Sequence, residues 1–228
     1  EILNNMKSIG ISNEQFLALR DKMIRDWKNV DLGDAYRIAR EKMRKIVRKH
    51  YYTNTELAVA AGNISLANVN EFGSKLLKKG YIQGLVYGNV TEEQARQNTK
   101  LLISQLKIKA AKWNEVTHQG RLEFVEGEDI IQVVGSEVNN SCFSRLQYFG
   151  NNSIDEDAQS RVIGTYVESP FFLEMRTSRQ LGYIVWGGAR STKKSSFFIF
   201  IIQSGDYTAD NLSKQADEYT ITLPDSLK

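Results

Sequence analysis

The sequence predicts an α+β fold in which helices pack on a mainly antiparallel sheet. In the first half of the chain, apolar residues recur every three or four positions, which is the spacing of one helix face. In the second half, β-type segments alternate with glycine- and asparagine-rich turns, and the run at 197–202 is wholly apolar, as in a strand covered on both faces. We therefore expect a helix-rich part at 1–106, a linker at 107–120 and an α+β part at 121–228.

The composition is ordinary for a globular protein, with 41% hydrophobic and 25% charged residues over 228 positions. The net charge of +3 is too small to require a polyanionic partner, and no apolar run reaches the ~20 residues that cross a bilayer. We therefore expect no nucleic acid and no membrane among the partners. Because the chain begins with Glu1 rather than Met, we expect a fragment or a processed product.

Two amphipathic helices are expected first. Ser12 and Gln15 form a capping box that opens a helix to about residue 29. Asp34 is a suitable N-cap for a second helix at 35–49. The apolar face of the first helix consists of Phe16, Leu19, Met23 and Trp27. The residues expected to be buried on the second helix are Ile38, Met43, Ile46 and Val47.

The second helix is rich in basic residues, namely Arg37, Arg40, Lys42, Arg44, Lys45, Arg48 and Lys49. One interpretation is a patch that binds nucleic acid or phosphate. The other is the solvated face of an amphipathic helix, whose last turn favours cations. We favour the solvated face, because neither a recognition motif nor a strong basic imbalance accompanies the cluster.

Two shorter helices are predicted at 53–62 and 65–79, followed by a β-type run at 81–88 that glycines bound. Thr91 and Gln94 form a second capping box, which opens one more helix before the linker. The second half then contains, in order, an expected hairpin at 121–126 and 129–138, a strand at 141–149, a helix at 154–168, paired strands at 182–191 and 196–204, and a final helix from Thr208.

The stretch at 170–185 contains the candidate functional residues. Pro170 suits the first position of a helix, so we expect a separate short helix here that breaks near Thr177 and Ser178. Arg176 carries a planar guanidinium that can bind a carbonyl or carboxylate. Tyr183 carries a phenol that can donate a hydrogen bond to a developing oxyanion. Across the helix-to-strand turn both residues could face one cavity. From the residues alone, however, we favour packing for both, with Arg176 as a cation at a helix end and Tyr183 as an ordinary strand aromatic.

Other reactive residue types are sparse. His50 and His118 are the two histidines, and neither begins an H-E-x-x-H or H-x-x-E-H motif. The chain therefore has no expected metal site of its own. The single cysteine, Cys142, excludes an internal disulfide, and we expect it to be a small core residue rather than a reactive thiol.

Several strings of the sequence resemble the insulinase (pitrilysin) family of zinc metallopeptidases, the inverzincins. In the second half these strings are Asn140-Ser141-Cys142, Phe171-Phe172-Leu173-Glu174-Met175-Arg176-Thr177, Gln180-Leu181-Gly182-Tyr183-Ile184-Val185 and Phe200-Ile201-Ile202-Gln203-Ser204. Upstream, residues 85–91 resemble the strand-to-helix joint that closes the third domain of the family. The most specific string is L-R-T…Q-L-G-Y-I-V, in which this chain has Met175 in place of leucine.

The resemblance implies insulinase-type, processing-peptidase-like half-domains. Residues 1–106 would end the third domain of a long family member, and residues 121–228 would begin its fourth. The zinc motif of the family lies in the first domain and is absent here, so the resemblance implies zinc in the intact enzyme and no activity for this chain alone. The partners that it implies are a peptide substrate and the N-terminal, zinc-bearing half of the same protein. By resemblance, Arg176 holds the substrate backbone and Tyr183 stabilises the scissile carbonyl.

Two functions remain open at this point. In the first, the chain is a C-terminal-half segment of a zinc metalloendopeptidase that forms chamber wall and contacts substrate at the scissile bond. In the second, it is a non-catalytic pseudo-peptidase module that binds peptides or a partner subunit, for instance by adding a strand at a sheet edge.

Overall fold

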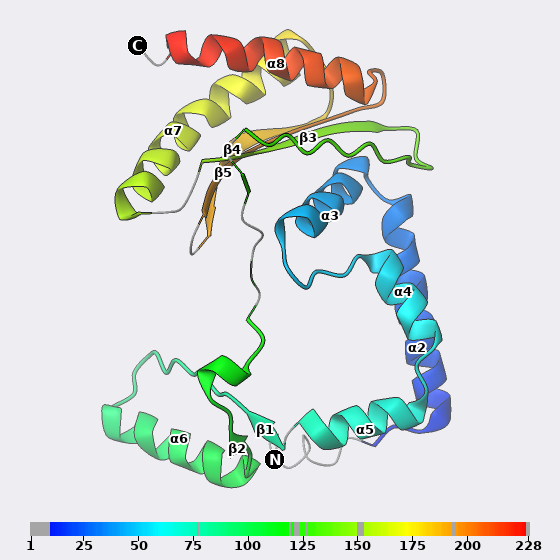
Figure 1. The fold of residues 1–228 in the computed structure, drawn as a ribbon, viewed down its shortest axis with the longest axis vertical. Helices are drawn as coiled ribbons and strands as arrows, with labels where there is room; N and C mark the ends of the chain where they lie inside the picture. Colours follow the sequence, from blue (N-terminus) through cyan, green and yellow to red (C-terminus); the bar gives the residue numbers. More distant parts are fainter. Residues whose placement is uncertain are drawn as a thin grey trace. The chain divides into compact units, whose positions relative to one another are not determined.

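A computed structural model describes residues 10–76, 78–118, 120, 124–125, 127–149, 153–192 and 195–226. Across these residues it confirms the α+β class, with seven α-helices and a small antiparallel sheet (Figure 1). The α-helices are α2 (Asn13–Asn29), α3 (Ala35–Val47), α4 (Asn54–Gly62), α5 (Leu66–Leu76), α6 (Glu92–Leu106), α7 (Ile154–Phe172) and α8 (Ala209–Ser226). The strands are β1 (Lys79–Gly80), β2 (Lys109–Ala110), β3 (Ser141–Tyr148), β4 (Ile184–Thr192) and β5 (Ser195–Ser204).

The chain divides into two compact units that interleave along the sequence. The first unit is drawn from residues 1–25 and 55–119, and the second from residues 26–54 and 120–228. The predicted division at 1–106, 107–120 and 121–228 refers to domains of longer proteins, and it stays a prediction.

Capping boxes start the helices where the sequence predicts them. The backbone N–H of Ser12 donates to Gln15 Oε1 at 2.9 Å, and the N–H of Gln15 donates to Ser12 Oγ at 3.1 Å. Thr91 and Gln94 make the same reciprocal pair at the start of α6. Each box satisfies two N–H groups that the first helical turn leaves without backbone partners.

The first unit contains a minimal sheet, in which β1 and β2 pair in parallel over two residues each. The strand predicted at 81–88 is wrong, because residues 81–87 take no regular secondary structure. Leu85 and Tyr87 in this stretch are 90% and 94% exposed. A β-type sequence forms a strand only beside a partner and a packed face, and among the described residues this segment has neither.

The second unit is built on the sheet β3-β5-β4, with every pairing antiparallel. Helices α7 and α8 cover one face of this sheet and α3 lies on the other (Figure 1). The central strand β5 is buried along almost its whole length. This arrangement confirms residues 197–202 as part of a strand that is covered on both faces.

The core of the second unit lies between the sheet and the α7–α8 pair. Its buried members are Val167, Phe171, Met175, Leu181, Val185, Phe198, Phe200, Ile202, Leu212 and Ala216. Alternate residues of β5 face this core, while the side chain of Gln203 on the opposite face accepts a hydrogen bond from the backbone N–H of Tyr36 at 2.8 Å. The sheet therefore holds the start of α3 close to the end of β5.

Two further expectations for the second half are wrong. Residues 129–138 form no strand, and the other arm of that hairpin lies partly outside the described residues. The helices predicted at 154–168 and from Pro170 are one continuous helix, α7, with Pro170 inside it. An internal proline costs a helix about 3 kcal/mol. Here Val167 and Phe171, on either side of it, are 2% and 0% exposed, and their burial offsets that cost.

Candidate functional site

The candidate site begins where α7 changes its winding. The six residues Leu173–Ser178 continue α7 as a π-helix, and the backbone N–H of Arg179 bonds to the carbonyl of Glu174, five residues earlier, at 2.9 Å. The helix ends at Ser178, close to the predicted break, but no periodicity in the sequence indicates a π-helix. Such turns are rare and are concentrated at functional sites.

The π-helix gives two consecutive residues opposite environments. Met175 is fully buried in the core, which fixes the rotation of the turn. Arg176, the next residue, is half-buried, and its guanidinium lies over the ring of Phe172 at 5.1 Å and over the ring of Tyr183 at 4.6 Å. Because Phe172 also packs against the core, these contacts hold the guanidinium at a defined place.

The backbone that leads to Tyr183 is equally constrained. Gln180 has a φ of 52°, and Gly182 lies so close to β5 that a Cβ on it would be 1.9 Å from the carbonyl oxygen of Gln203. Ile184, which follows Tyr183, is the register partner of Gln203. Position 182 therefore needs glycine, and that close approach fixes where Tyr183 leaves the sheet.

The structure brings the two predicted site residues into contact, but it leaves their polar groups open. Tyr183 is 79% exposed, and among the described residues its hydroxyl has no hydrogen-bond partner. Arg176 likewise makes no ion pair or hydrogen bond with any described residue through its guanidinium. The donors of both side chains are thus available to an external carbonyl or carboxylate.

A cavity lies beside this pair. It measures about 370 Å³ and is lined by Glu168, Ser169, Phe172, Leu173, Val185, Trp186 and Gly187. Arg176 and Tyr183 are not among its lining residues, so the expectation that both face one cavity is not confirmed. Phe172, whose ring lies under the guanidinium of Arg176, does line the cavity. Because β4 is an edge strand of the described sheet, an extended chain could pair with it at this cavity.

Arg179 ties the end of the π-helix to α8, and sequence reasoning missed it. Its Nε donates to Glu174 Oε1 at 2.8 Å, and its Nη1 pairs with Glu218 Oε2 at 3.0 Å. The same Nη1 also donates to the side chain of Gln215. These partners lie 36 and 39 residues away, so no local pattern could have identified them.

Cys142 lies on β3 and is half-buried, so the expectation of a core residue is met only in part. Burial raises the pKa of the Cys142 thiol to about 12, so it is neutral at physiological pH and a poor nucleophile. Among the described residues, no three His, Cys, Asp or Glu side chains are placed to hold a metal ion. These residues therefore do not fit the zinc that the family resemblance implies. None of the described helices is both long and apolar enough to span a membrane.

Part of this chain matches a known family, and almost the whole chain is similar in sequence to segments of longer proteins. Residues 162–228 match the family described as PQQ synthase PqqF-like, C-terminal lobe domain 4. The chain is 23% identical over 226 residues to the putative zinc protease mug138 of Schizosaccharomyces pombe, covering 96% of this chain and 23% of that protein. It is 23% identical over 233 residues to insulin-degrading enzyme of Homo sapiens, covering 100% of this chain and 23% of the enzyme.

The fold comparison agrees with the sequence comparison. The crystal structure of pitrilysin superposes with a TM-score of 0.73 at 19% identity, over 95% of this chain and 23% of that one. The chain thus spans about a quarter of the length of the relatives that it matches, and it corresponds to a segment of larger proteins.

Proposed function

We propose, from the relationship of this chain to the C-terminal lobe of the insulinase and pitrilysin family, that it is a segment of a zinc metalloendopeptidase. In this proposal the segment forms part of the chamber wall and contacts the peptide substrate at the scissile bond. Its partners are the peptide and the N-terminal, zinc-bearing half of the same polypeptide. In this proposal the zinc belongs to that other half.

The observation that carries this proposal is the contact between Arg176 and Tyr183. Both side chains are held in place by stacking, yet their hydrogen-bonding groups have no described partner. Such preorganised donors stabilise charge that develops during a reaction, because they need not reorient when it appears. Tyr183 would donate to the carbonyl oxygen of the scissile bond, and Arg176 would bind a neighbouring backbone carbonyl or carboxylate of the substrate.

The cavity beside Phe172 supports a peptide as the ligand. It is lined largely by carbon-rich side chains and opens at the edge strand β4, where a peptide backbone can hydrogen-bond while one of its side chains enters the cavity. Phe172 both lines the cavity and contacts Arg176, which in turn contacts Tyr183. In this proposal the bound side chain and the polarised carbonyl belong to neighbouring parts of one peptide.

The decisive test is Tyr183→Phe in the full-length enzyme. Removing one oxyanion donor typically lowers kcat by ~10²–10³-fold. We expect a loss of that order with little change in KM. The circular dichroism spectrum and melting temperature should be unchanged, because the side chain is 79% exposed and its hydroxyl makes no hydrogen bond with any described residue. A kcat equal to that of the wild type would rule out the role assigned to Tyr183.

The alternative, a non-catalytic module that binds peptides or a partner subunit, rests on the edge strand and the cavity alone. It predicts that the full-length protein binds peptides without cleaving them and that no H-x-x-E-H motif occurs in the rest of the polypeptide. Peptide cleavage by the full-length protein, together with the Tyr183→Phe result, separates the two functions.

A further inference from the structure

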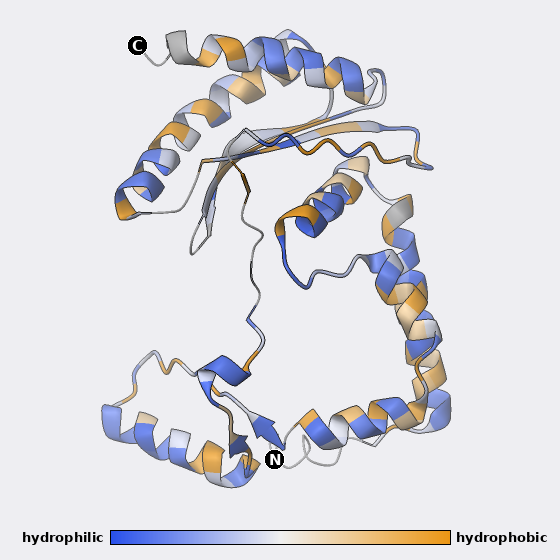
Figure 2. Ribbon diagram, in the orientation of Figure 1, coloured by the Kyte–Doolittle hydropathy of each residue, from blue (hydrophilic) through white to orange (hydrophobic). Residues whose placement is uncertain are grey.

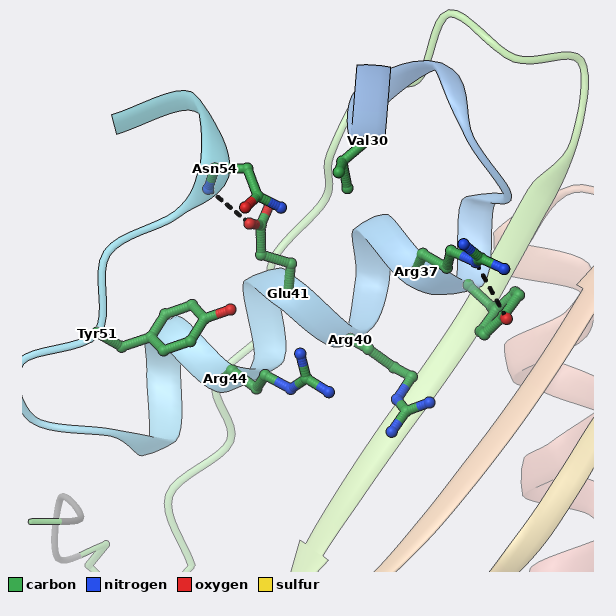
Figure 3. A pocket seen from close by; sticks show the side chains of 8 residues that line it. Val30, Arg37, Arg40, Glu41, Arg44, Tyr51 and Asn54 are labelled. Carbon is green, nitrogen blue, oxygen red and sulfur yellow. Dashed lines mark hydrogen bonds between the residues drawn. The ribbon is translucent and has the colours of Figure 1, made fainter. Parts of the chain in front are cut away.

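A second cavity of the second unit lies on α3, on the face of the sheet opposite α7 and α8. It measures about 300 Å³ and is lined by Val30, Tyr36, Arg37, Arg40, Glu41, Arg44, Tyr51 and Asn54 (Figure 3). The four charged members occupy positions i, i+3, i+4 and i+7 of α3, so they form one face of the helix. This cavity shares no lining residue with the one at Phe172.

The loop after α3 forms the second wall of the cavity. Glu41 is only 3% exposed, and its Oε1 accepts a hydrogen bond from the backbone N–H of Asn54 at 2.6 Å. Figure 3 shows this bond, with Tyr51 beside the helix and its hydroxyl directed toward it. Glu41 therefore ties the loop to α3, and the second oxygen of the same carboxylate is buried with no hydrogen-bond partner among the described residues.

The cations of the cavity differ in how they are paired. Arg37 lies 3.3 Å from Asp34 Oδ2 and donates to the hydroxyl of Tyr36, so its charge is already offset. Among the described residues, Arg40 and Arg44 have neither an ion pair nor a side-chain hydrogen bond. Their side chains project together from α3 in Figure 3, one helical turn apart. Two unpaired like charges at this spacing repel each other, and a bound anion removes that repulsion.

We propose that this cavity binds an acidic peptide segment. Two neighbouring Asp or Glu carboxylates of that peptide would bind the guanidinium groups of Arg40 and Arg44. Arginine binds carboxylates through two parallel N–H groups, and clusters of arginine are a common means of recognising acidic motifs. Two separate guanidinium groups match two carboxylates of one segment. The role of Arg40 and Arg44 is independent of the role proposed for Tyr183, and it can be measured as binding alone.

The size of the cavity favours a peptide over a lone inorganic anion. A volume of about 300 Å³ is at the lower end of pockets that hold small organic ligands, whereas a phosphate ion would leave most of it to water. Val30 and the rings of Tyr36 and Tyr51 add carbon surface that contacts the body of a ligand but offers a free ion nothing. The sequence alone favoured a solvated basic face on α3. Arg40 and Arg44 differ from the other cations there because they line the cavity and, unlike Arg37, have no described partner.

The test is fluorescence anisotropy of the whole chain with a labelled peptide of glycine and glutamate, beside the same peptide with glutamine. We expect the glutamate peptide to bind and the glutamine peptide not to bind. Arg40→Gln and Arg44→Gln should each weaken binding by about tenfold, as expected for charge-assisted hydrogen bonds. Glu41→Gln keeps an oxygen for the N–H of Asn54 and removes a negative charge, so it should strengthen binding.

Arg96→Gln is the matched control, because it removes the same charge from an exposed pair with Glu92 on α6. It should leave binding of the glutamate peptide unchanged. An equal loss for Arg96→Gln and Arg40→Gln would overturn the site in favour of non-specific attraction. The proposal also fails if inorganic phosphate binds, in a direct titration at matched ionic strength, while the glutamate peptide does not. Circular dichroism of each variant shows whether it is folded, and the exposed, unpaired side chains of Arg40 and Arg44 should make both changes harmless to the fold.

Discussion

Arg176 and Arg179 are three residues apart, yet they differ sharply in what they contact. Arg179 is paired with Glu174 and Glu218, which is how an arginine stabilises a fold. Arg176 contacts only aromatic rings through its guanidinium and keeps its N–H donors free of described partners. The purely structural explanation of Arg176, as a cation at a helix end, accounts for its position but not for the stacking that orients it.

The sequence singles out Arg176 and Tyr183 as candidates, and that assignment stays a prediction; their contact could not be predicted. Arginine and tyrosine near a helix-to-strand turn indicate which hydrogen-bonding groups are present. Whether they meet depends on the π-helix, which rotates Arg176 over Phe172, and on the close approach of Gly182 to β5. Both depend on tertiary packing, which no spacing rule in the sequence reports.

Arg176→Lys in the full-length enzyme tests the role of the planar guanidinium. Lysine keeps the charge but cannot form two parallel hydrogen bonds or stack as a plane. We expect KM for a peptide substrate to rise by about tenfold, equivalent to about 1.4 kcal/mol of lost binding. Steady-state kinetics measures the change. Arg20→Lys is the matched control, because the guanidinium of Arg20 also lies over a ring, that of Phe16, on α2. An equal rise in KM for both variants would contradict a specific role for Arg176.

Among the elements, those with a continuous local signal were predicted well. The alternating and apolar runs of β3, β4 and β5 and the capping boxes of α2 and α6 specify their structure locally. Residues 81–88 and 129–138 have similar β-type sequences, but they do not pair with any strand among the described residues. A strand needs a partner, so its sequence alone gives a propensity and not a structure. At Pro170 the local sequence predicts the start of a new helix, yet α7 continues through the proline because the residues around it are buried.

Gly182→Ala tests whether the start of β4 is held by close packing. The added Cβ would lie 1.9 Å from the carbonyl oxygen of Gln203, which is backbone and cannot move aside cheaply. We expect the free energy of unfolding to fall by about 1–3 kcal/mol, the usual cost of overpacking. Chemical denaturation of the chain measures it.

Gly73→Ala is the control for that change, since a Cβ there meets nothing within 4 Å and the residue lies inside α5. Alanine is favoured over glycine in a helix by about 1 kcal/mol, so this variant should be neutral or more stable. Equal stability of Gly182→Ala and the unmodified chain would contradict this prediction, because it would mean that the backbone before β4 shifts to accommodate the added Cβ without cost.

At the scale of the whole molecule, several large apolar side chains of the described residues are exposed. Figure 2 shows hydrophobic positions recurring along α5 and α6. Phe72 on α5 and Leu101 on α6 are 65% and 57% exposed, although large apolar side chains usually pack against a neighbour. This fits the finding that the chain covers 23% of the length of the relatives that it matches.

The interleaving of the two units also explains a limit of reading domains from sequence. The helix α3, at residues 35–47, belongs to the unit built on β3, β4 and β5, although almost a hundred residues separate it from the first of these strands. Its buried Ile38 and Val47 were predicted from their spacing. The surface that these residues cover could not be predicted, because helical periodicity shows which face of a helix is buried but not what that face packs against.

The last prediction follows from the chain as a whole. Its sequence has no H-x-x-E-H motif, and its described residues hold no cluster that fits a metal. In the proposed function Tyr183 polarises a peptide and Arg176 holds it, but neither supplies the nucleophile that cleaves it. We therefore expect the purified 228-residue chain to cleave no fluorogenic peptide, with or without added Zn²⁺, and to retain far less than one equivalent of zinc after equilibrium dialysis. Cleavage that a chelator abolishes would contradict the assignment of zinc chemistry to another part of the polypeptide, because the catalytic centre would then lie within these residues.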